Sequence, residues 1–205
     1  FLAMKISYAN ALAAVCETVG ADVSMVTRGM GMDRRICPSF LNAGVGYGGF
    51  CFPKDLEAFF WICQKKGYDF KLLKDVMEIN ETQKGWVLRK VSEELWNLEG
   101  KKAAVLGLAF KPDTDDLRYA PSLEIIAGLQ KAGMQVTAYD PVAMPKAAAL
   151  LPGVALAKDA YACAKGADAL IVVTEWPEFA GLDLKKIKAL LRTPLLLDGR
   201  NLFDP

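Results

Sequence analysis

The chain has 205 residues, 53% of them hydrophobic and 24% charged, which is typical of a globular protein with one large or two small domains. Its 25 basic and 24 acidic residues leave a net charge of +1, so no strong field favours nucleic acid or an anionic membrane as a partner. No uninterrupted apolar run approaches the length of a membrane span.

The first half of the sequence is predicted to be almost wholly helical. Apolar residues at helical spacing predict a helix over residues 2–19 that stops at Gly20, and Asp22 is placed to cap a short helix that reaches about Arg28. The helical pattern is present from the first residue, without a cap or polar lead-in. We therefore expect a piece of a longer protein, cut inside a helix.

Two more helices are expected before residue 98. One begins at Pro53, a residue suited to the first helical position, and ends near Gly67. The other is one long helical run over about residues 70–97, weakened locally at Gly85, and it is long enough to bridge two domains.

The pattern changes at Gly100, after which short apolar runs alternate with helical segments. This alternation predicts a doubly wound parallel sheet, whose ligands bind beyond the carboxyl ends of the strands. The expected strands begin near residues 102, 135, 169 and 195, and the expected helices cover residues 121–131, 143–150 and 184–191. The side chains predicted at the binding edge of the sheet are Phe110, Lys111, Asp140, Glu175, Asp198 and Arg200.

A glycine-rich segment, Gly44-Val-Gly-Tyr-Gly-Gly-Phe-Cys-Phe-Pro-Lys-Asp, precedes the helix expected at Pro53. Cys51 is predicted to lie just ahead of that helix and near Lys54, an electropositive setting that favours a thiolate nucleophile. Asp55 and Glu57 are expected in the first helical turn. A buried, inert thiol is the alternative, and the other four cysteines are interpreted as core or incidental.

The glycines of this segment have three interpretations. They match the G-x-G-x-x-G dinucleotide fingerprint, but no strand precedes them and no βαβ unit follows, so that interpretation is disfavoured. A structural turn and a loop that cradles a ligand remain, and the adjoining cysteine favours the ligand.

A polar segment over residues 110–122 follows the first predicted strand. It is either a solvated loop or an anion site in which Lys111 and Arg118 lie beside a helix N-terminus, with Arg200 as a further cation. Arg34 and Arg35 are interpreted as surface charges on residue type alone.

Histidine is absent and no cysteines show C-x-x-C spacing, so we expect no metal, no disulfides and a reducing cytoplasm.

Together these motifs resemble those of the UDP-glucose/GDP-mannose dehydrogenase family. The cysteine segment is similar to the family's G-x-G-F-G-G-S-C-F-P-K-D loop, and Phe110–Arg118 to its F-K-x-x-T-x-D-x-R segment. Tyr139-Asp-Pro and Asp198-Gly-Arg complete the set in the family's order. The resemblance implies a central helical dimerisation domain over 1–98 and an α/β, Rossmann-like UDP-sugar-binding domain over 99–205, joined by a long helix.

The resemblance also implies an activity: oxidation of a sugar C6 alcohol, in UDP-glucose, to a carboxylate with two NAD+ and no metal. Cys51 would attack the intermediate aldehyde, and Asp55 would help to position or activate water. The implied cofactor contacts are Lys54 and Arg118, and Arg35 would be lent to the neighbouring subunit of a homodimer. The implied substrate contacts are Phe40, Leu41, Asn42, Gly46, Tyr47, Phe52, Phe110, Lys111 and Arg200.

The sequence departs from the family at several points. The NAD-binding domain and the catalytic K-x-x-x-N pair are expected upstream of these residues, and Lys5 and Asn10 are not that pair, so the 205 residues alone are expected to be inactive. Phe50 replaces the usual serine, and Asn42 stands where a lysine is frequent. GDP-mannose and UDP-N-acetylaminosugars therefore stay open as substrates, as does a binding and dimerisation module without chemistry.

Overall fold

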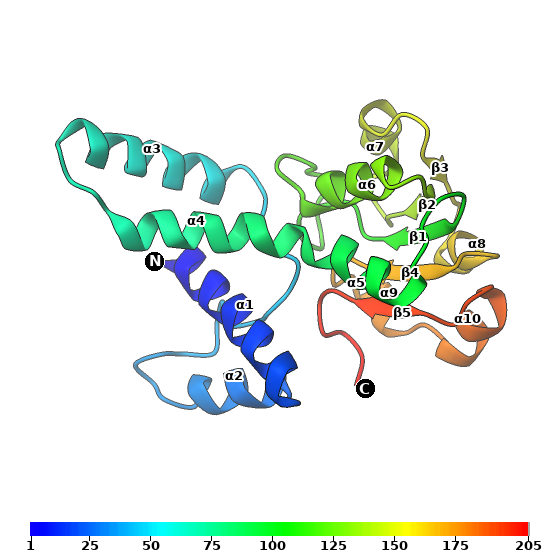
Figure 1. Ribbon diagram of the computed structural model, residues 1–205, viewed down its shortest axis with the longest axis horizontal. Coiled ribbons are helices and arrows are strands. Elements are labelled where there is room, and N and C mark those ends of the chain that lie inside the picture. The colour runs from blue at the N-terminus through cyan, green and yellow to red at the C-terminus, as the bar shows by residue number, and fades with distance from the viewer. Residues whose placement is uncertain (205) are drawn as a thin grey trace.

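The computed structural model describes residues 1–204, in which a group of helices is followed by a parallel β-sheet (Figure 1). The helices of the first part are α1 (Leu2–Val19), α2 (Val23–Gly31), α3 (Cys51–Lys65), α4 (Lys71–Lys84) and α5 (Trp86–Leu95). None of the described helices is both long and apolar enough to cross a bilayer.

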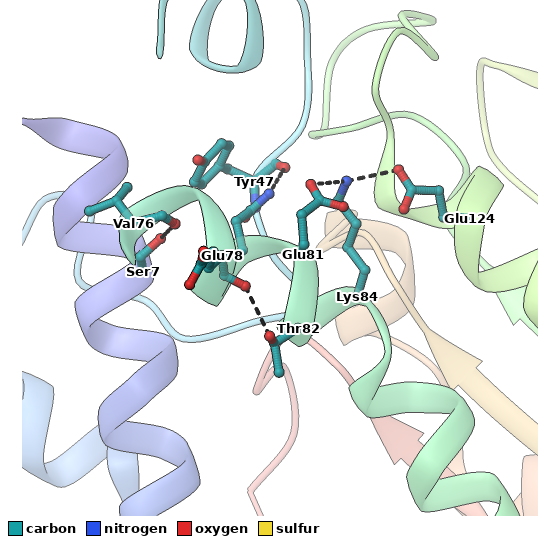
Figure 2. Close-up of polar contacts among 9 residues, drawn as sticks. Ser7, Tyr47, Val76, Glu78, Glu81, Thr82, Lys84 and Glu124 are labelled. Atoms are coloured by element: carbon teal, nitrogen blue, oxygen red, sulfur yellow. Dashed lines mark hydrogen bonds and ion pairs between the residues drawn. The ribbon is translucent and has the colours of Figure 1, made fainter. Parts of the chain in front are cut away.

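Helix α1 ends and α2 begins where the sequence predicts. Gly20 caps α1 in the left-handed conformation with a φ of 68°, and the Asp22 carboxylate accepts a hydrogen bond from the Ser24 N–H to cap α2. Helix α4 packs against α1, and the Ser7 hydroxyl donates a hydrogen bond of 2.8 Å to the Val76 carbonyl between them (Figure 2).

The predicted single helix over residues 70–97 is wrong, because two helices meet at Gly85 and the second ends at Leu95. The Gly85 N–H donates to the Thr82 carbonyl, three residues back, which tightens the last turn of α4. Trp96 ends α5 with a φ of 57° and a ψ of −65°. Helices α4 and α5 together still lead from the helical part to the sheet (Figure 1).

The sheet confirms the predicted doubly wound topology. Its strand order is β3-β2-β1-β4-β5, and every described pairing is parallel. The direction of strand addition reverses after β3, and right-handed crossovers then place α6 and α7 on one face and α8 and α10 on the other. The strands are β1 (Lys102–Leu106), β2 (Gln135–Tyr139), β3 (Ala155–Leu156), β4 (Ala169–Val172) and β5 (Leu196–Asp198).

The helices around the sheet are α6 (Pro121–Lys131), α7 (Met144–Leu150), α8 (Ala160–Ala164), α9 (Pro177–Ala180) and α10 (Leu184–Leu190). The sequence did not predict β3, α8 or α9, which have two, five and four residues and are too short to show a clear period. The sheet forms the main core, since β1 is buried from Ala103 through Leu106 and β4 throughout.

Candidate active site

A cavity of about 570 Å³ lies where the helical part meets the carboxyl edge of the sheet. The sheet contributes residues that follow β1, β4 and β5, and these three strands surround the point where the strand order reverses. The lining residues that the sequence predicted are Phe40, Asn42, Gly46, Tyr47, Cys51, Phe52, Phe110, Lys111, Glu175, Arg118 and Arg200; Ile6, Gly48, Gly49, Phe50 and Asp116 complete the lining.

Cys51 is the first residue of α3, not a residue ahead of it. Pro53 is therefore the third helical position, and Asp55 and Glu57 lie beyond the first turn, contrary to the prediction. A proline is tolerated anywhere in the first turn because those N–H groups have no partner within the helix, so the helix can begin two residues earlier. Phe50 provides no side-chain cap, which leaves the positive end of the helix dipole at the exposed thiol.

Two cations lie beside Cys51 on the ring of Phe50. The Arg118 guanidinium carbon is 4.5 Å from the ring centroid and the Lys54 ammonium is 5.4 Å from it. A serine at position 50, as in the motif that this segment resembles, could not provide such a surface. A charged Cys51 thiolate adds to the forces that raise the pKa of both cations, although their own carboxylate partners contribute more.

The Arg118 side chain is oriented by Asp116. Its Nε and Nη2 donate hydrogen bonds of 2.9 and 2.7 Å to the two carboxylate oxygens. This pairing holds the pKa of Asp116 below its usual value. Lys54 donates to the Asp55 carboxylate at 2.5 Å, which is the main reason that its pKa is raised.

An aromatic wall closes the cavity on the side of the helical part. Phe52 packs against Phe40 with ring centroids 6.1 Å apart and makes an edge-on contact with Tyr47 at 5.8 Å. Burial raises the pKa of Tyr47 to about 12, so its phenol stays protonated at neutral pH. Lys111 also lines the cavity, with its ammonium 5.5 Å from the centroid of Phe110.

Arg200 is held by Glu175 in a two-pronged ion pair. Its Nη2 and Nε lie 2.7 and 2.6 Å from the two carboxylate oxygens. Both residues, with Asn42, also line a second cavity of about 470 Å³, to which Leu41 and Arg28 contribute. The two cavities thus adjoin at Asn42, Glu175 and Arg200.

Two carboxylates predicted at the binding edge have structural roles instead. Asp140 is 1% exposed and accepts hydrogen bonds from the Leu108 and Ala109 N–H groups and from the indole of Trp176. Asp198 accepts from the backbone of Arg200 and from two residues that follow it. Carboxylates occupied in this way stabilise the loops at the strand ends and are not available to a ligand.

Four further predicted site residues do not line the first cavity. Leu41 is buried and faces the second cavity, and Lys54 and Asp55 pair with each other on the surface of α3. Arg35 is exposed and paired with Asp33. Lys54 and Asp55 lie within about one turn of Cys51 on α3, and the charge of a Cys51 thiolate adds to the forces that raise the pKa of Lys54.

Lys5 has a structural role that the sequence did not indicate. Its buried ammonium donates to the carbonyls of Ile36, Cys37 and Ser39, and it thereby fixes the turn before Phe40. The sequence signal for this role was a single lysine on the buried face of α1, because a lysine is seldom buried without a partner.

The glycines of the cysteine segment allow it to pack closely against the sheet part. A Cβ on Gly48 would lie 2.8 Å from Cδ of Pro121 and still closer to the Tyr119 carbonyl, and one on Gly49 would lie 2.7 Å from the Phe110 ring. The Gly49 N–H also donates to the Arg118 carbonyl at 3.0 Å. The segment is therefore docked on the sheet part, which gives a structural reason for its glycines; a role in cradling a ligand stays a prediction.

Comparison with known proteins gives a consistent result. Residues 1–82 match the model of the UDP-glucose/GDP-mannose dehydrogenase family, central domain, and residues 104–205 match its UDP binding domain. A UDP-glucose 6-dehydrogenase of Bacillus subtilis, TuaD, is 48% identical over all of this chain, which spans 44% of that protein.

Solved structures agree on the fold. A UDP-glucose dehydrogenase from Pyrobaculum islandicum is 36% identical with a TM-score of 0.92, over 98% of this chain and 45% of that one. A UDP-D-ManNAc dehydrogenase from Pyrococcus horikoshii is 27% identical with a TM-score of 0.81, over 98% and 46% of the two chains. The chain thus spans about half the length of the relatives that it matches.

Proposed function

The chain belongs to the UDP-glucose/GDP-mannose dehydrogenase family, and on that premise we propose that it provides the cysteine-bearing and UDP-binding parts of an NAD-dependent UDP-glucose 6-dehydrogenase. The observation that supports this most directly is the single cavity that joins Cys51 to Phe110, Lys111 and Arg200. Residues 1–98 are the central domain in this proposal, and residues 99–205 the nucleotide-sugar domain.

The cavity offers separate places for the two ends of a nucleotide sugar. Lys111 and Arg200 would bind the diphosphate, since cations at the carboxyl edge of a parallel sheet suit an anionic ligand. The sugar would then extend toward the helical part, where Phe40, Asn42 and the Gly46–Tyr47 backbone lie near the cysteine.

Cys51 would act on the aldehyde formed in the first oxidation. Its sulfur bonds to the carbonyl carbon, and the carbonyl oxygen takes up the electron pair and a proton, which gives a thiohemiacetal. After the second oxidation, water adds to the thioester, the C–S bond breaks, and a carboxylate and the thiol are released. Asp55, one helical turn after Cys51, is the residue that we assign to orient this water.

NAD is the proposed cofactor, and bound NAD+ would supply the acceptor for hydride. Lys54 and Arg118 fit a contact with an anionic dinucleotide, because both are exposed cations that lie on Phe50 beside the thiol. The described residues hold no glycine fingerprint between a strand and a helix at this cavity. We therefore expect residues 1–205 alone not to form NADH.

UDP is expected to stabilise the chain against heat. At about 100 times its dissociation constant it should add roughly 2.7 kcal/mol, which corresponds to an increase in Tm of about 5–11 °C for a chain of this size. Differential scanning fluorimetry with UDP, GDP and no nucleotide measures this. The absence of a shift with either nucleotide would contradict the assignment of the binding domain.

The variant Arg200→Lys sharpens this test. A lysine keeps the charge that faces Glu175 but loses the planar fork, so UDP should bind about tenfold or more weakly. Arg192→Lys is the matched control, since Arg192 pairs with Asp168 at the opposite edge of the sheet, ahead of β4. Equal losses in the two variants would show that Arg200 has no particular role.

UDP-glucose is the substrate that the comparisons favour, because identity is 48% to a UDP-glucose enzyme and 27% to a UDP-D-ManNAc enzyme. GDP-mannose and UDP-N-acetyl sugars are the alternatives. We propose measuring kcat/KM for all three classes with the full-length natural polypeptide that contains this sequence. A higher value for either alternative would overturn the choice of UDP-glucose.

A homodimer is proposed through the helical part. Its surface exposes large apolar side chains, among them Phe59, Trp61, Ile62 and Leu72 on α3 and α4, where a second copy would cover them. A monomer in sedimentation equilibrium at tens of micromolar would contradict this.

Five free cysteines support a reducing cytoplasm as the location, which fractionation of cells would test.

A further inference from the structure

Three amide side chains hold the backbone of the cysteine segment from the side of the helical part. The Gly44 N–H donates to Oδ1 of Asn10 at 2.7 Å, and Nε2 of Gln83 donates to the Gly44 carbonyl at 2.7 Å. The Tyr47 N–H donates to Oδ1 of Asn80 at 2.7 Å, and Nδ2 of Asn80 donates to the Tyr47 carbonyl at 3.2 Å. Figure 2 shows the Tyr47 backbone bound in this way beside α4.

These contacts satisfy backbone groups that have no other regular partner. Gly44 and Tyr47 are buried, yet they lie in a segment that belongs to neither a helix nor a strand. A buried N–H or carbonyl without a partner destabilises the fold, because it loses its hydrogen bonds to water and gains none within the protein. Asparagine and glutamine carry a donor and an acceptor at once, so they can replace the neighbouring strand that the segment lacks.

The buried amides do not simply fill space. Asn10 and Asn80 are 1% and 3% exposed, and Nδ2 of Asn10 finds no partner among residues 1–204. An apolar side chain would avoid that loss, but it would leave the Gly44 N–H unpaired. The contact with the segment is thus the feature that accounts for a polar residue there.

The opposite side of the segment is fixed by the sheet part. The Gly49 N–H donates to the Arg118 carbonyl, and Gly199 packs against Val45 closely enough that a Cβ would lie 2.5 Å from the valine side chain. Helix α4 is itself tied to the sheet part by Lys84. Its ammonium lies 2.8 Å from a carboxylate oxygen of Glu81, on the same helix, and 2.8 Å from one of Glu124, on α6 (Figure 2). Cys51 follows Tyr47 by four residues, so its position depends on both supports.

We propose that Asn10, Asn80 and Gln83 are positioning residues, which set the cysteine segment so that the Cys51 thiol faces the sugar end of the cavity. This rests on the proposed dehydrogenase function. Their hydrogen bonds are made to Gly44 and Tyr47, whereas the proposed diphosphate contacts, Lys111 and Arg200, belong to the sheet part. Loss of these bonds should therefore affect the reaction more than the binding of the nucleotide.

The test uses Gln83→Glu and Asn80→Asp in the full-length natural polypeptide that contains this sequence. Each variant keeps the shape and removes the donated hydrogen bond; Gln83 is only half-buried, so its variant should fold even if Asn80→Asp does not. We expect kcat for UDP-glucose oxidation to fall about 10–100-fold while KM changes less than about twofold, because small displacements at a reacting centre have effects of this size. Gln130→Glu is the matched control, since Gln130 also donates to a backbone carbonyl, that of Pro152, far from the segment, and its kcat and KM should not change.

Hydrogen exchange at the Gly44 and Tyr47 amides, measured in Asn10→Leu and Asn80→Leu, separates this proposal from the proposed function, because each leucine removes the side-chain oxygen that accepts from one of these two N–H groups. Faster exchange in the variants, together with the loss in kcat, supports the positioning role. Three results would overturn it: faster exchange with unchanged kcat, an equal loss of kcat in Gln130→Glu, or a rise in KM that accounts for the whole loss in kcat/KM. If the unaltered protein forms no NADH from UDP-glucose, the proposed function fails on its own, and unchanged exchange in the variants would still refute the contacts.

Discussion

Replacing Cys51 by serine in the full-length natural polypeptide that contains this sequence is expected to reduce NADH formation from UDP-glucose by about 10³-fold or more. A serine hydroxyl is isosteric but does not ionise near neutral pH, so neither the dipole of α3 nor the cations on Phe50 can make it an effective nucleophile. Steady-state absorbance of NADH at saturating UDP-glucose and NAD+ measures the effect.

The binding of UDP should survive this change, because the proposed diphosphate contacts lie on the sheet part. Cys37→Ser is the control: Cys37 is also exposed, but it does not line the cavity, and turnover should stay close to that of the unaltered protein. Turnover in Cys51→Ser equal to that of the control would rule out covalent catalysis by this thiol.

The sheet could be predicted because its strands carry their own signal. Residues 103–106 and 169–172 are short apolar runs between turn residues, and a strand buried on both faces needs such a run whatever its neighbours are. The alternation of these runs with helical segments then gave the doubly wound class. The order of the strands in the sheet is a property of the whole topology, and no local stretch of the sequence indicates it.

Element boundaries were predicted less well, and the reasons are local. Gly85 keeps a helical φ of −72°, but its ψ of −13° lets α4 end and α5 begin without a loop, so the apolar period continues across the break. At Cys51 the helix begins two residues earlier than Pro53 suggested, because nothing in the first turn requires the proline to be first. The apolar periodicity of the sequence detects neither the break at Gly85 nor the early start of α3 at Cys51.

Part of the candidate site could likewise be predicted from the sequence, and part could not. Cys51 and its segment are contiguous, so residue types alone indicated a reactive thiol at a helix N-terminus. Asn10, Asn80 and Gln83 are 33 to 39 residues distant from the backbone groups that they bind, and an amide in a helix gives no sign of its partner. Such contacts become visible only when α1 and α4 are placed beside the segment.

Replacing Gly48 by alanine is expected to have a large effect on stability. A Cβ there would overlap the Tyr119 carbonyl and lie 2.8 Å from Pro121, and neither a backbone carbonyl nor a proline ring can rotate away. Overpacking of this kind costs about 1–3 kcal/mol, and the rigid partners favour the upper end, which corresponds to a decrease in Tm of about 6–12 °C. Thermal unfolding followed by circular dichroism measures it.

Gly29→Ala is the control for this prediction, and the two variants should differ in sign. Gly29 lies within α2, a Cβ added there would meet no other atom within 4 Å, and the residue does not need a positive φ, so alanine should stabilise the helix by about 0.5–1 kcal/mol. Gly48→Ala should also weaken the binding of UDP, because a segment pushed away from Tyr119 carries Gly49 away from the Phe110 ring. An unchanged Tm in Gly48→Ala would mean that the cysteine segment does not dock on the sheet part, and the cavity that joins the thiol to the cations of the sheet would then lose its basis.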